Sequence, residues 1–374
     1  MKKKIILSVT NDLTSEQRVH KVCLFLLRIG FDVTLIGRKQ RKSLPLENRP
    51  YKTKRMFLLF EKGPLFYMEY NLRLFLYLMF LQADVLVAND LDTLLGNYII
   101  SKLKGAKLVH DSHEYFTGVP ELKGRNFAKS FWKKIERWIF PKLKYVYTVN
   151  ASIAKLYLDE YGISANVVRN FPLLIENGNK ISKSRYELGL PENKKIILYQ
   201  GSVNVDRGIA EAVEAMQYVN DAVLLIVGAG DIIEEVKSRA KQLHLNEKIV
   251  FIKKVPFSEL KNYTVHADIG ISLDKDTNIN YKFSLPNKIF DYIHAGIPVL
   301  SSNLTEIKKI FMQYEIGMMI ENHQPRHIAE KINLMLQDSD KRKIWKENLP
   351  LAAREFCWQN EEKNLEKIYT SLFQ

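Results

Sequence analysis

Hydrophobic and polar residues follow two alternating patterns along this chain. Short runs rich in Val, Ile and Leu are separated by longer segments in which apolar residues recur every three or four positions. The short runs are typical of buried strands, and the longer segments are typical of helices that cover a sheet. Their alternation predicts an α/β protein built on parallel sheets.

The pattern divides the chain into two halves. In the first half we predict strands at residues 4–9, 32–36, 85–88, 107–110 and 145–149, with helices that include 16–29 and 91–103. In the second half we predict strands at residues 195–200, 222–227, 248–252, 268–272, 298–301 and 317–320. Residues 171–194 contain two prolines and two glycines and little apolar periodicity, which is typical of a linker. We therefore expect two domains that meet near residue 175.

The charge is distributed unevenly between the halves. Residues 1–175 hold 29 Lys or Arg against 15 Asp or Glu, whereas residues 176–374 hold 27 of each, so the net charge of +14 belongs to the first half. Such a surface attracts phosphate on nucleic acid, on anionic lipid or on a lipid-linked diphosphate. The sequence contains no helix-turn-helix, ribonucleoprotein strand or zinc-ligand pattern, so we expect no nucleic-acid partner.

Cysteine usage and hydropathy favour a cytoplasmic protein. Cys23 and Cys357 are too few for a disulfide framework, which favours a reducing compartment. The first apolar run, residues 5–9, ends too soon for a signal peptide. Residues 64–81, the longest apolar stretch, contain a Glu, an Asn and an Arg near their middle and are not expected to span a membrane.

Ligands of doubly wound sheets bind at the carboxyl ends of the strands, so polar residues that follow strands are candidate site residues. Residues 199–209 follow one strand and open a helix, which would surround an anion with the backbone N–H groups of Gly201 and Ser202 and the guanidinium of Arg207. A solvated arginine in the first turn of a helix would have the same spacing.

A second candidate segment starts at another helix. Pro286 and Asn287 suit a helix start, and Gly296 suits its end. Lys288 then lies in the first turn and Asp291 on the same face, where a cation meets phosphate and a carboxylate accepts hydrogen bonds from ribose. An ordinary ion pair between residues i and i+3 is the alternative.

This segment resembles the donor-binding helix of the family 4 glycosyltransferases, whose pattern is a Glu, seven residues, and then Glu-Ala-Met-Ala-x-Gly-x-Pro-Val. Asp291 matches the second Glu, which binds the donor ribose, whereas Phe283 stands in place of the first. The Leu-Pro-Asn-Lys form seen here is that of some bacterial members. Arg207 replaces the family's phosphate-binding Lys, and Lys288 supplies a second cation.

The resemblance implies the GT-B fold, with two Rossmann-like domains facing each other across a cleft. Residues 1–175 would form the acceptor-side domain and residues 176–355 the domain that binds the nucleotide sugar. A C-terminal helix within residues 356–374 would cross back to the first domain.

On the acceptor side, the strand at 107–110 is followed by Asp-Ser-His-Glu. His113 resembles the family's His beside the donor sugar, although a structural histidine is the alternative. Glu114 either belongs to the site, orients the histidine or caps the next segment. Asp90, which follows the strand at 85–88, is a similar candidate.

The loop after the first strand corresponds to the family's loop near the acceptor and the β-phosphate. Asn11, Asp12 and Arg18 are the candidates there, while Thr14 or Ser15 would serve as a plain helix cap.

Two further motifs are interpreted without a ligand. The Gly-x-Gly turn at residues 227–231 has two of the three glycines of a dinucleotide fingerprint and is expected only to end a strand. The Asp-Lys-Asp at residues 274–276 is interpreted as a polar loop, because the GT-B fold needs no metal. We therefore expect neither a metal nor a separate cofactor.

Two basic stretches account for the excess charge. Residues 38–55 hold eight Lys or Arg, and residues 123–144 hold eight more together with five Phe or Trp at amphipathic helical spacing. Such a mixture suits the headgroups of an anionic bilayer, so we predict peripheral attachment to the inner face of the cytoplasmic membrane, with Trp132 or Trp138 in the interface. A domain helix with a solvated face is the alternative.

Taken with the resemblance, the sequence predicts a metal-independent, retaining hexosyltransferase. It would move a sugar from a UDP- or GDP-sugar to a lipid-linked or glycan acceptor in cell-surface polysaccharide synthesis, such as that of lipopolysaccharide or capsule. We assign catalysis to His113, Arg207 and Lys288. A sugar-nucleotide epimerase on the same fold and a non-catalytic glycan- or membrane-binding module are the alternatives.

Overall fold

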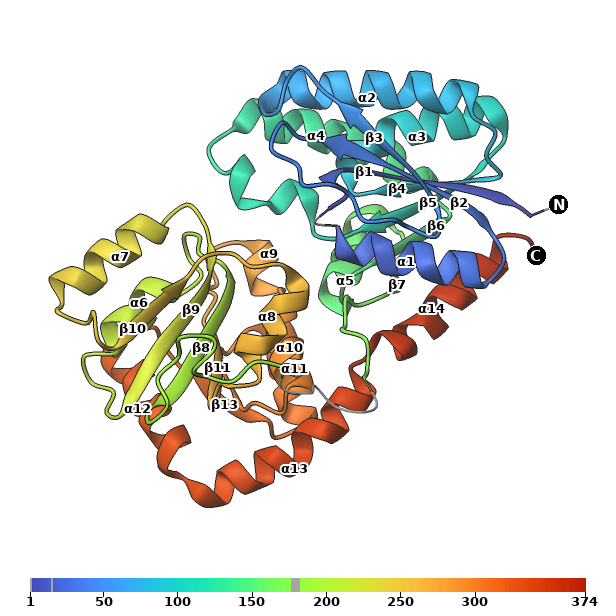
Figure 1. Cartoon of the computed structure of the whole chain (residues 1–374). Helices are drawn as coiled ribbons and strands as arrows, with labels where there is room; N and C mark the ends of the chain where they lie inside the picture. Colours follow the sequence, from blue (N-terminus) through green and yellow to red (C-terminus); the bar gives the residue numbers. More distant parts are fainter. Residues whose placement is uncertain (1, 15, 176–181) are drawn as a thin grey trace. The chain divides into compact units, whose positions relative to one another are not determined.

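A computed structural model describes residues 2–14, 16–175 and 182–374, and it divides the chain into two compact units (Figure 1). The N-terminal unit comprises Met1–Asn170 and Glu362–Gln374, and the C-terminal unit comprises Phe171–Glu361. Ser15, one of the two residues considered as a helix cap, lies outside the described residues. Glu16 is the N-cap of the first helix, and its side chain accepts a hydrogen bond from the backbone N–H of Val19.

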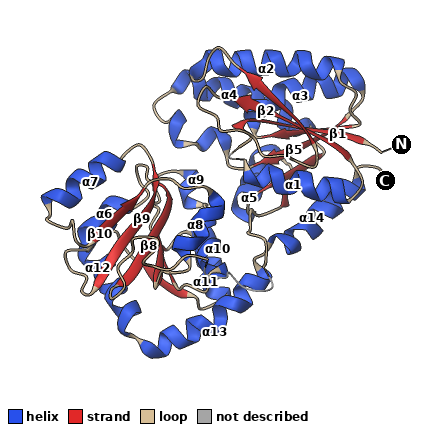
Figure 2. Ribbon diagram, viewed as in Figure 1, coloured by secondary structure: helices blue, strands red, loops and turns tan. Residues whose placement is uncertain are grey.

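The N-terminal unit is built on a seven-stranded parallel sheet in the order β3-β2-β1-β4-β5-β6-β7 (Figure 2). Its strands are β1 (Lys4–Asp12), β2 (Asp32–Lys39), β3 (Lys52–Phe57), β4 (Val85–Asn89), β5 (Lys107–Ser112), β6 (Tyr145–Thr148) and β7 (Asn166–Val167). Its helices are α1 (Gln17–Arg28), α2 (Gly63–Phe80), α3 (Leu91–Lys104), α4 (Asn126–Ile139), α5 (Ala151–Tyr161) and the end of α14 (Trp358–Ser371). The sheet therefore reverses its strand order beside β1, where such folds bind ligands.

Helices cover both faces of this sheet. Helices α2, α3 and α4 lie side by side on one face, and α1 and the end of α14 lie on the other (Figure 1). The ring of Tyr369 in α14 packs against Phe25 of α1 and against Phe31. The predicted return of a C-terminal helix to the first domain is thus confirmed.

The C-terminal unit contains a six-stranded parallel sheet in the order β10-β9-β8-β11-β12-β13. Its strands are β8 (Lys195–Ser202), β9 (Ala222–Ala229), β10 (Ile249–Ile252), β11 (Ile269–Ser272), β12 (Val299–Ser302) and β13 (Gly317–Ile320). Its helices are α6 (Ile209–Ala215), α7 (Ile233–Gln242), α8 (Phe257–Thr264), α9 (Ile279–Lys282), α10 (Asn287–His294), α11 (Thr305–Gln313), α12 (Pro325–Gln337) and α13 (Ser339–Glu355).

The central strands of both sheets are buried on both faces, which explains their continuous apolar runs. Ile196, Ile197 and Leu198 of β8 have no exposed surface, and Val85 of β4 has none either. The predicted α/β class with two Rossmann-like sheets is therefore confirmed. Within the described residues, no helix is both long enough and apolar enough to cross a membrane.

Candidate active site

In the C-terminal unit, the loop between β8 and α6 packs tightly against the end of β11. Gly208 has φ +70°, and a Cβ atom built there would lie 2.1 Å from the carbonyl oxygen of Leu273. Glycine is therefore required for both the left-handed conformation and the close approach. This approach brings Arg207, the preceding residue, beside the carboxyl end of β11.

Arg207 is held by a carboxylate that the sequence did not assign to the site. Its Nη1 lies 3.0 Å from Oδ2 of Asp274, which has no exposed surface, and its guanidinium lies over the ring of Tyr281 at 4.4 Å. Burial opposes the charge of Arg207, but Asp274 outweighs burial and raises the arginine pKa. Residues 274–276 lie in a loop, as interpreted, and within it Asp274 is the buried counter-ion of Arg207.

Lys288 provides the second cation from the first turn of α10. It is 9% exposed, and its Nζ lies 3.9 Å from the ring centroid of Tyr199. Burial and the nearby charge of Arg207 together lower the pKa of Lys288 to about 8, although Asp274 opposes the shift. A phosphate bound here would reverse the shift because it favours the charged amine. The predicted helix with Lys288 in its first turn is confirmed.

Asp291 lies one turn later and is oriented by a chain of hydrogen bonds. Its Oδ2 accepts from Nε2 of Gln200 at 2.8 Å, and Oε1 of Gln200 accepts from the hydroxyl of Thr264 at 2.8 Å. Gln200 was not a candidate, although its position at the end of a buried strand, next to Gly201, was the signal available in the sequence.

The remaining donor-side candidates, Gly201, Ser202 and Asn287, are exposed and lie near Arg207, Lys288 and Asp291 in the chain. Gly201 and Ser202 end β8 and are exposed, and Asn287 is exposed at the start of α10. A Cβ atom on Gly228 would lie 1.9 Å from the carbonyl oxygen of Gly201, so β8 and β9 approach closely at this end. All the donor-side candidates therefore belong to one unit and one edge of its sheet.

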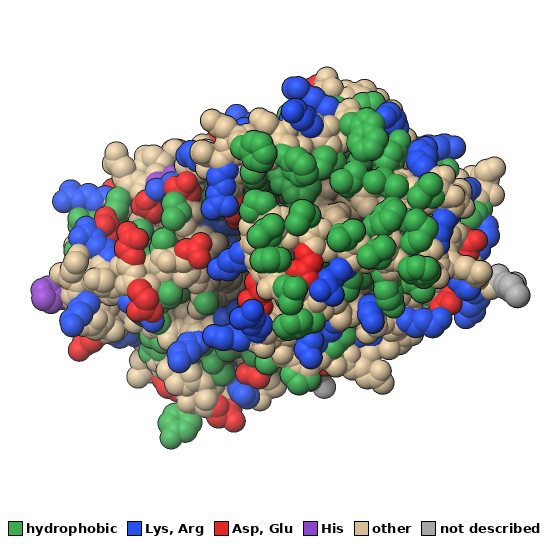
Figure 3. All heavy atoms as spheres, turned by 90° about the horizontal axis from the view of Figure 1, so that it is seen from above, with side chains coloured by type: hydrophobic (Ala, Val, Ile, Leu, Met, Phe, Trp, Pro, Cys, Tyr) green, Lys and Arg blue, Asp and Glu red, His purple; other side chains and the backbone are tan. Residues whose placement is uncertain are grey.

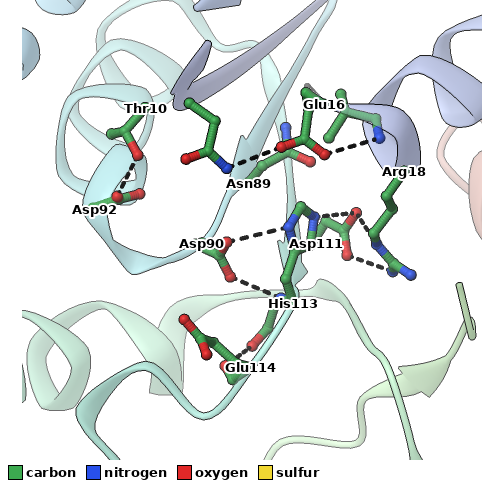
Figure 4. A network of polar contacts seen from close by, with 12 residues as sticks. Thr10, Glu16, Arg18, Asn89, Asp90, Asp92, Asp111, His113 and Glu114 are labelled. Atoms are coloured by element: carbon green, nitrogen blue, oxygen red, sulfur yellow. Dashed lines mark hydrogen bonds and ion pairs between the residues drawn. The ribbon is translucent and has the colours of Figure 1, made fainter. Parts of the chain in front are cut away.

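The N-terminal unit has its own polar centre at the carboxyl ends of β4 and β5 (Figure 4). His113 stands between two aspartates, with Nδ1 3.2 Å from Oδ2 of Asp90 and Nε2 3.1 Å from Oδ2 of Asp111. Its backbone N–H also donates to Asp90 at 2.7 Å. Burial alone would lower the histidine pKa, but the two carboxylates raise it to about 9, so the ring is positively charged at neutral pH.

Asp111 joins His113 to Arg18. The arginine makes a two-point contact with this carboxylate, 2.8 Å from Nη2 and 3.2 Å from Nε, and its Nη1 donates to the carbonyl of Val168 at 3.0 Å. Burial would raise the pKa of Asp111, yet Arg18 and His113 hold it well below its usual value. Arg18, a predicted acceptor-side residue, is buried and pairs with this buried carboxylate.

Asp90 has an unusual backbone conformation. It adopts φ +61° and ψ 167°, a region that is almost restricted to glycine. Strain of this kind costs about 1–3 kcal/mol and is concentrated at functional sites. Because both carboxylate oxygens of Asp90 contact His113, the strained backbone holds the aspartate against the imidazolium.

Further carboxylates surround this cluster. Burial and the charge of Asp90 raise the pKa of Asp92 to about 7. Although the side chain of Glu114 reaches solvent, partial desolvation and the charges of Asp90 and Glu121 raise its pKa to about 8. The polar centre of the N-terminal unit is therefore rich in carboxylates that bind protons near neutral pH.

The other two candidates of this segment, Asn11 and Asp12, are the last two residues of β1. The side-chain amide of Asn11 donates to Glu16 at 2.9 Å, and Glu16 lies beside the cluster (Figure 4). Asp12 accepts from Arg55 at 2.9 Å and also from the hydroxyl of Ser43, so its contacts run toward β3. Arg18, Asp90 and His113 are thus brought together, while Asp12 belongs to a separate pair.

The chain folds into two parallel α/β units. One has a pair of cations at the carboxyl ends of its strands, and the other has His113 between two aspartates. This architecture is the GT-B fold. Two family models match the chain. "Glycosyltransferase Family 4" matches residues 15–172, and "Glycosyl transferases group 1" matches residues 180–351. The chain belongs to the family 4 glycosyltransferases, and it is a retaining enzyme that transfers a sugar from a nucleotide sugar.

Relatives and solved structures agree with this assignment. An uncharacterized glycosyltransferase of Methanocaldococcus jannaschii is 24% identical over 294 residues, which are 75% of this chain and 72% of the relative. The sucrose-phosphate synthase of Thermosynechococcus elongatus has a TM-score of 0.81 at 16% identity, with 100% and 99% of the two chains covered. HepE of Anabaena, solved in complex with UDP and glucose, has a TM-score of 0.76 at 15% identity, with 99% and 100% covered.

Proposed function

We propose that this enzyme transfers a hexose from a UDP-sugar to a lipid-linked acceptor in cell-surface polysaccharide synthesis, at the inner face of the cytoplasmic membrane. The observation that carries the donor half of the proposal is the pairing of Arg207 and Lys288 at one edge of the C-terminal sheet. UDP is favoured over GDP because HepE, a structure of the same fold, was solved with UDP and glucose.

The diphosphate would lie against these two cations. Arg207 already contacts Asp274 through Nη1, and its Nε is buried without a hydrogen-bond partner among the described residues. An arginine held by one carboxylate on one side is positioned in advance for an anion on the other. Asp291, oriented by Gln200, would accept hydrogen bonds from the ribose hydroxyls.

The proposed reaction depends on stabilising the negative charge that develops on the leaving diphosphate. As the bond between the anomeric carbon and the diphosphate oxygen breaks, negative charge grows on the diphosphate, and Arg207 and Lys288 stabilise it. The acceptor hydroxyl attacks the same face of the sugar, and its proton passes to the departing phosphate oxygen. We assign the acceptor side to the polar cluster of the N-terminal unit, with His113 as its catalytic residue and with Asn11, Asp90 and Glu114 around the acceptor. Arg18 supports this cluster through its contact with Asp111, whereas Asp12 forms a separate ion pair with Arg55.

The lipid-linked acceptor is proposed from the charge of the N-terminal unit. The whole net charge of +14 lies within residues 1–175. A basic unit at an anionic membrane would attract both the bilayer and a diphosphate linked to lipid.

A transfer assay with radiolabelled sugar nucleotides tests the proposal. We expect label from a UDP-hexose to enter a lipid-extractable product when membrane lipids of polysaccharide synthesis are supplied, and not when they are omitted. Conversion of the donor to an epimer without transfer would contradict it, as would transfer from GDP-sugars alone. Arg239→Ala is the matched control because Arg239 also pairs with a carboxylate, Glu214 at 2.7 Å, but lies in an exposed helix of the same unit.

A further inference from the structure

Helix α2 has an exposed apolar stripe along its whole length. Leu65, Met68, Leu72, Leu76 and Phe80 are all exposed, and Phe80 is 85% exposed. Their spacing of three and four residues places them on one face of the helix. The opposite face, formed by Phe66, Tyr70, Leu74 and Leu78, packs into the core between the helix and the sheet.

Helix α4 carries a second stripe in the same layer of helices. Phe127, Phe131 and Trp138 are exposed at helical spacing, and Phe127 is 87% exposed. Figure 3 looks down on the layer that contains α2, α3 and α4, and it shows hydrophobic side chains gathered over the N-terminal unit with Lys and Arg side chains around them. Isolated apolar side chains are common on protein surfaces, but a continuous face of this kind marks a binding surface.

The carboxylate on α2 is satisfied by partners within the unit. Glu69, its one carboxylate, accepts the backbone N–H groups of Leu59 and Phe60 and pairs with Arg73 at 2.7 Å. These bonds hold Leu59 and Phe60, both exposed, at the start of the helix. At the other end, Lys104 donates to the carbonyl oxygens of residues 78, 79 and 81, so the last turn of α2 has hydrogen-bond partners other than water.

The exposed charges of α3 and α4 are positive. Helices α3 and α4 together carry six Lys or Arg, and their two acidic residues, Asp92 and Glu136, are both buried. Lys134 lies within the stripe of α4, between Phe131 and Trp138. Exposed aliphatic and aromatic side chains bordered by cations match an anionic lipid surface, in which the apolar groups enter the acyl region and the cations meet the headgroups.

We propose that the exposed faces of α2 and α4 form one membrane-binding surface, the α2–α4 face, with α2 lying in the plane of an anionic bilayer. The proposal deepens the proposed function because it names the surface that brings the enzyme to a lipid-linked acceptor. Of the two tryptophans predicted for the interface, it takes the exposed Trp138 and not Trp132. Trp132 is buried and packs edge-on against Tyr67 of α2 and against Phe116, so it joins α4 to its neighbours.

Co-sedimentation of the full chain with phosphatidylcholine vesicles, with and without phosphatidylglycerol, tests this surface. We expect binding that requires phosphatidylglycerol and that persists in part at high salt, because apolar insertion is not screened. Leu72→Ser combined with Leu76→Ser should lower the partition coefficient about tenfold or more and remove the salt-resistant part. Lys129→Gln combined with Lys134→Gln should weaken binding at low salt only.

A matched control comes from the other unit. Met312 and Leu334 are exposed apolar residues on α11 and α12, and replacing both with Ser should leave vesicle binding unchanged. Equal binding by the Leu72/Leu76 variant and the wild type would overturn the proposal. So would a dimer in lipid-free solution that this variant converts to monomer, since the face would then bind a second copy of the chain.

Thermal shift with UDP, measured on the same samples, separates this proposal from the proposed function. None of the substituted residues belongs to the donor or acceptor site, so every variant should keep the UDP-induced shift of the wild type. Loss of vesicle binding with an intact UDP shift would locate the membrane contact. Vesicle binding in a wild type that shows no UDP shift would support the surface while contradicting the donor site.

Discussion

The polar centres of the two units have opposite character. In the C-terminal unit two cations, Arg207 and Lys288, share one buried counter-ion, Asp274. In the N-terminal unit the carboxylates outnumber the cations around His113, and two of them bind protons near neutral pH. A cationic centre suits a diphosphate, whereas an acidic centre suits hydroxyl groups, which are hydrogen-bond donors.

The comparison shows that net charge does not locate a site. The N-terminal half carries the whole charge excess of the chain, yet its polar centre is the more acidic one. Its cations lie largely on the outer surface, including the α2–α4 face. The electrically balanced half holds the phosphate-binding cations, because two well-placed side chains are sufficient there.

The largest effect is expected when the clamp on His113 is broken. Asp111→Asn leaves the buried Arg18 without its carboxylate, and it should lower the free energy of unfolding by about 3–5 kcal/mol. Asp274→Asn should cost less, because the side chain of Arg207 is 26% exposed and keeps access to water. Denaturant unfolding of the two variants checks the order, and a larger loss for Asp274→Asn would reverse this part of the comparison.

The carboxylate of Asp111 also makes the stability of the folded protein depend on pH. The pKa of Asp111 is depressed in the folded protein, so its contribution is present above the unfolded value of about 3.9 and is lost as the pH falls below it. Unfolding midpoints between pH 6 and pH 3 should therefore fall less steeply in Asp111→Asn than in the wild type.

Removal of either donor-side cation should lower turnover while the fold survives. Arg207→Ala or Lys288→Ala is expected to reduce kcat by about 10² to 10³, the usual effect of losing one preorganised group on a leaving group. Steady-state kinetics and circular dichroism check the two parts. Wild-type kinetics in both variants would remove the diphosphate site from this edge of the sheet.

Lys288 also gives donor binding a pH dependence. Its pKa is about 8 in the free enzyme, and only the protonated amine binds phosphate, so UDP affinity should fall about tenfold from pH 7 to pH 9. Lys288→Arg keeps its charge over this range and should bind UDP almost equally at both pH values. An unchanged slope in Lys288→Arg would assign the pH dependence to another group.

Asp291 should have the smallest effect of the donor-side residues. Asp291→Asn keeps one acceptor atom and is expected to weaken UDP-sugar binding about tenfold or less, with little change in the KM for the acceptor. If the acceptor KM rose instead, Asp291 would contact the acceptor rather than the ribose.

Much of the fold could be predicted because buried parallel strands have a simple pattern. All six strands of the C-terminal sheet coincide with predicted apolar runs. In the N-terminal unit, β3 was missed because its first four residues are Lys, Thr, Lys and Arg, which suit an exposed edge strand rather than a buried one. The two-residue β7 is too short to produce a pattern.

The site was predicted less completely, because its partners are distant in the sequence. Arg207 and Asp274 are 67 residues apart, and Arg18 and Asp111 are 93 apart, so no local pattern could pair them. His113 and Asp90 could be identified as candidates because each follows a strand. Only the structure shows that both carboxylate oxygens of Asp90 contact His113. The exposed stripe of α2 could not be predicted for a different reason. Both faces of that helix are apolar, so the sequence does not show which face is buried and which is exposed.

Calorimetric titration with UDP is the most direct test of the central claim, which is that the paired cations of the C-terminal unit bind the nucleotide diphosphate. Wild type and the Arg239→Ala control should bind UDP with equal affinity, and Arg207→Ala should bind at least about tenfold more weakly, as expected for a lost charge-assisted contact. Equal affinity in all three proteins, or the same loss in Arg239→Ala as in Arg207→Ala, would contradict the account.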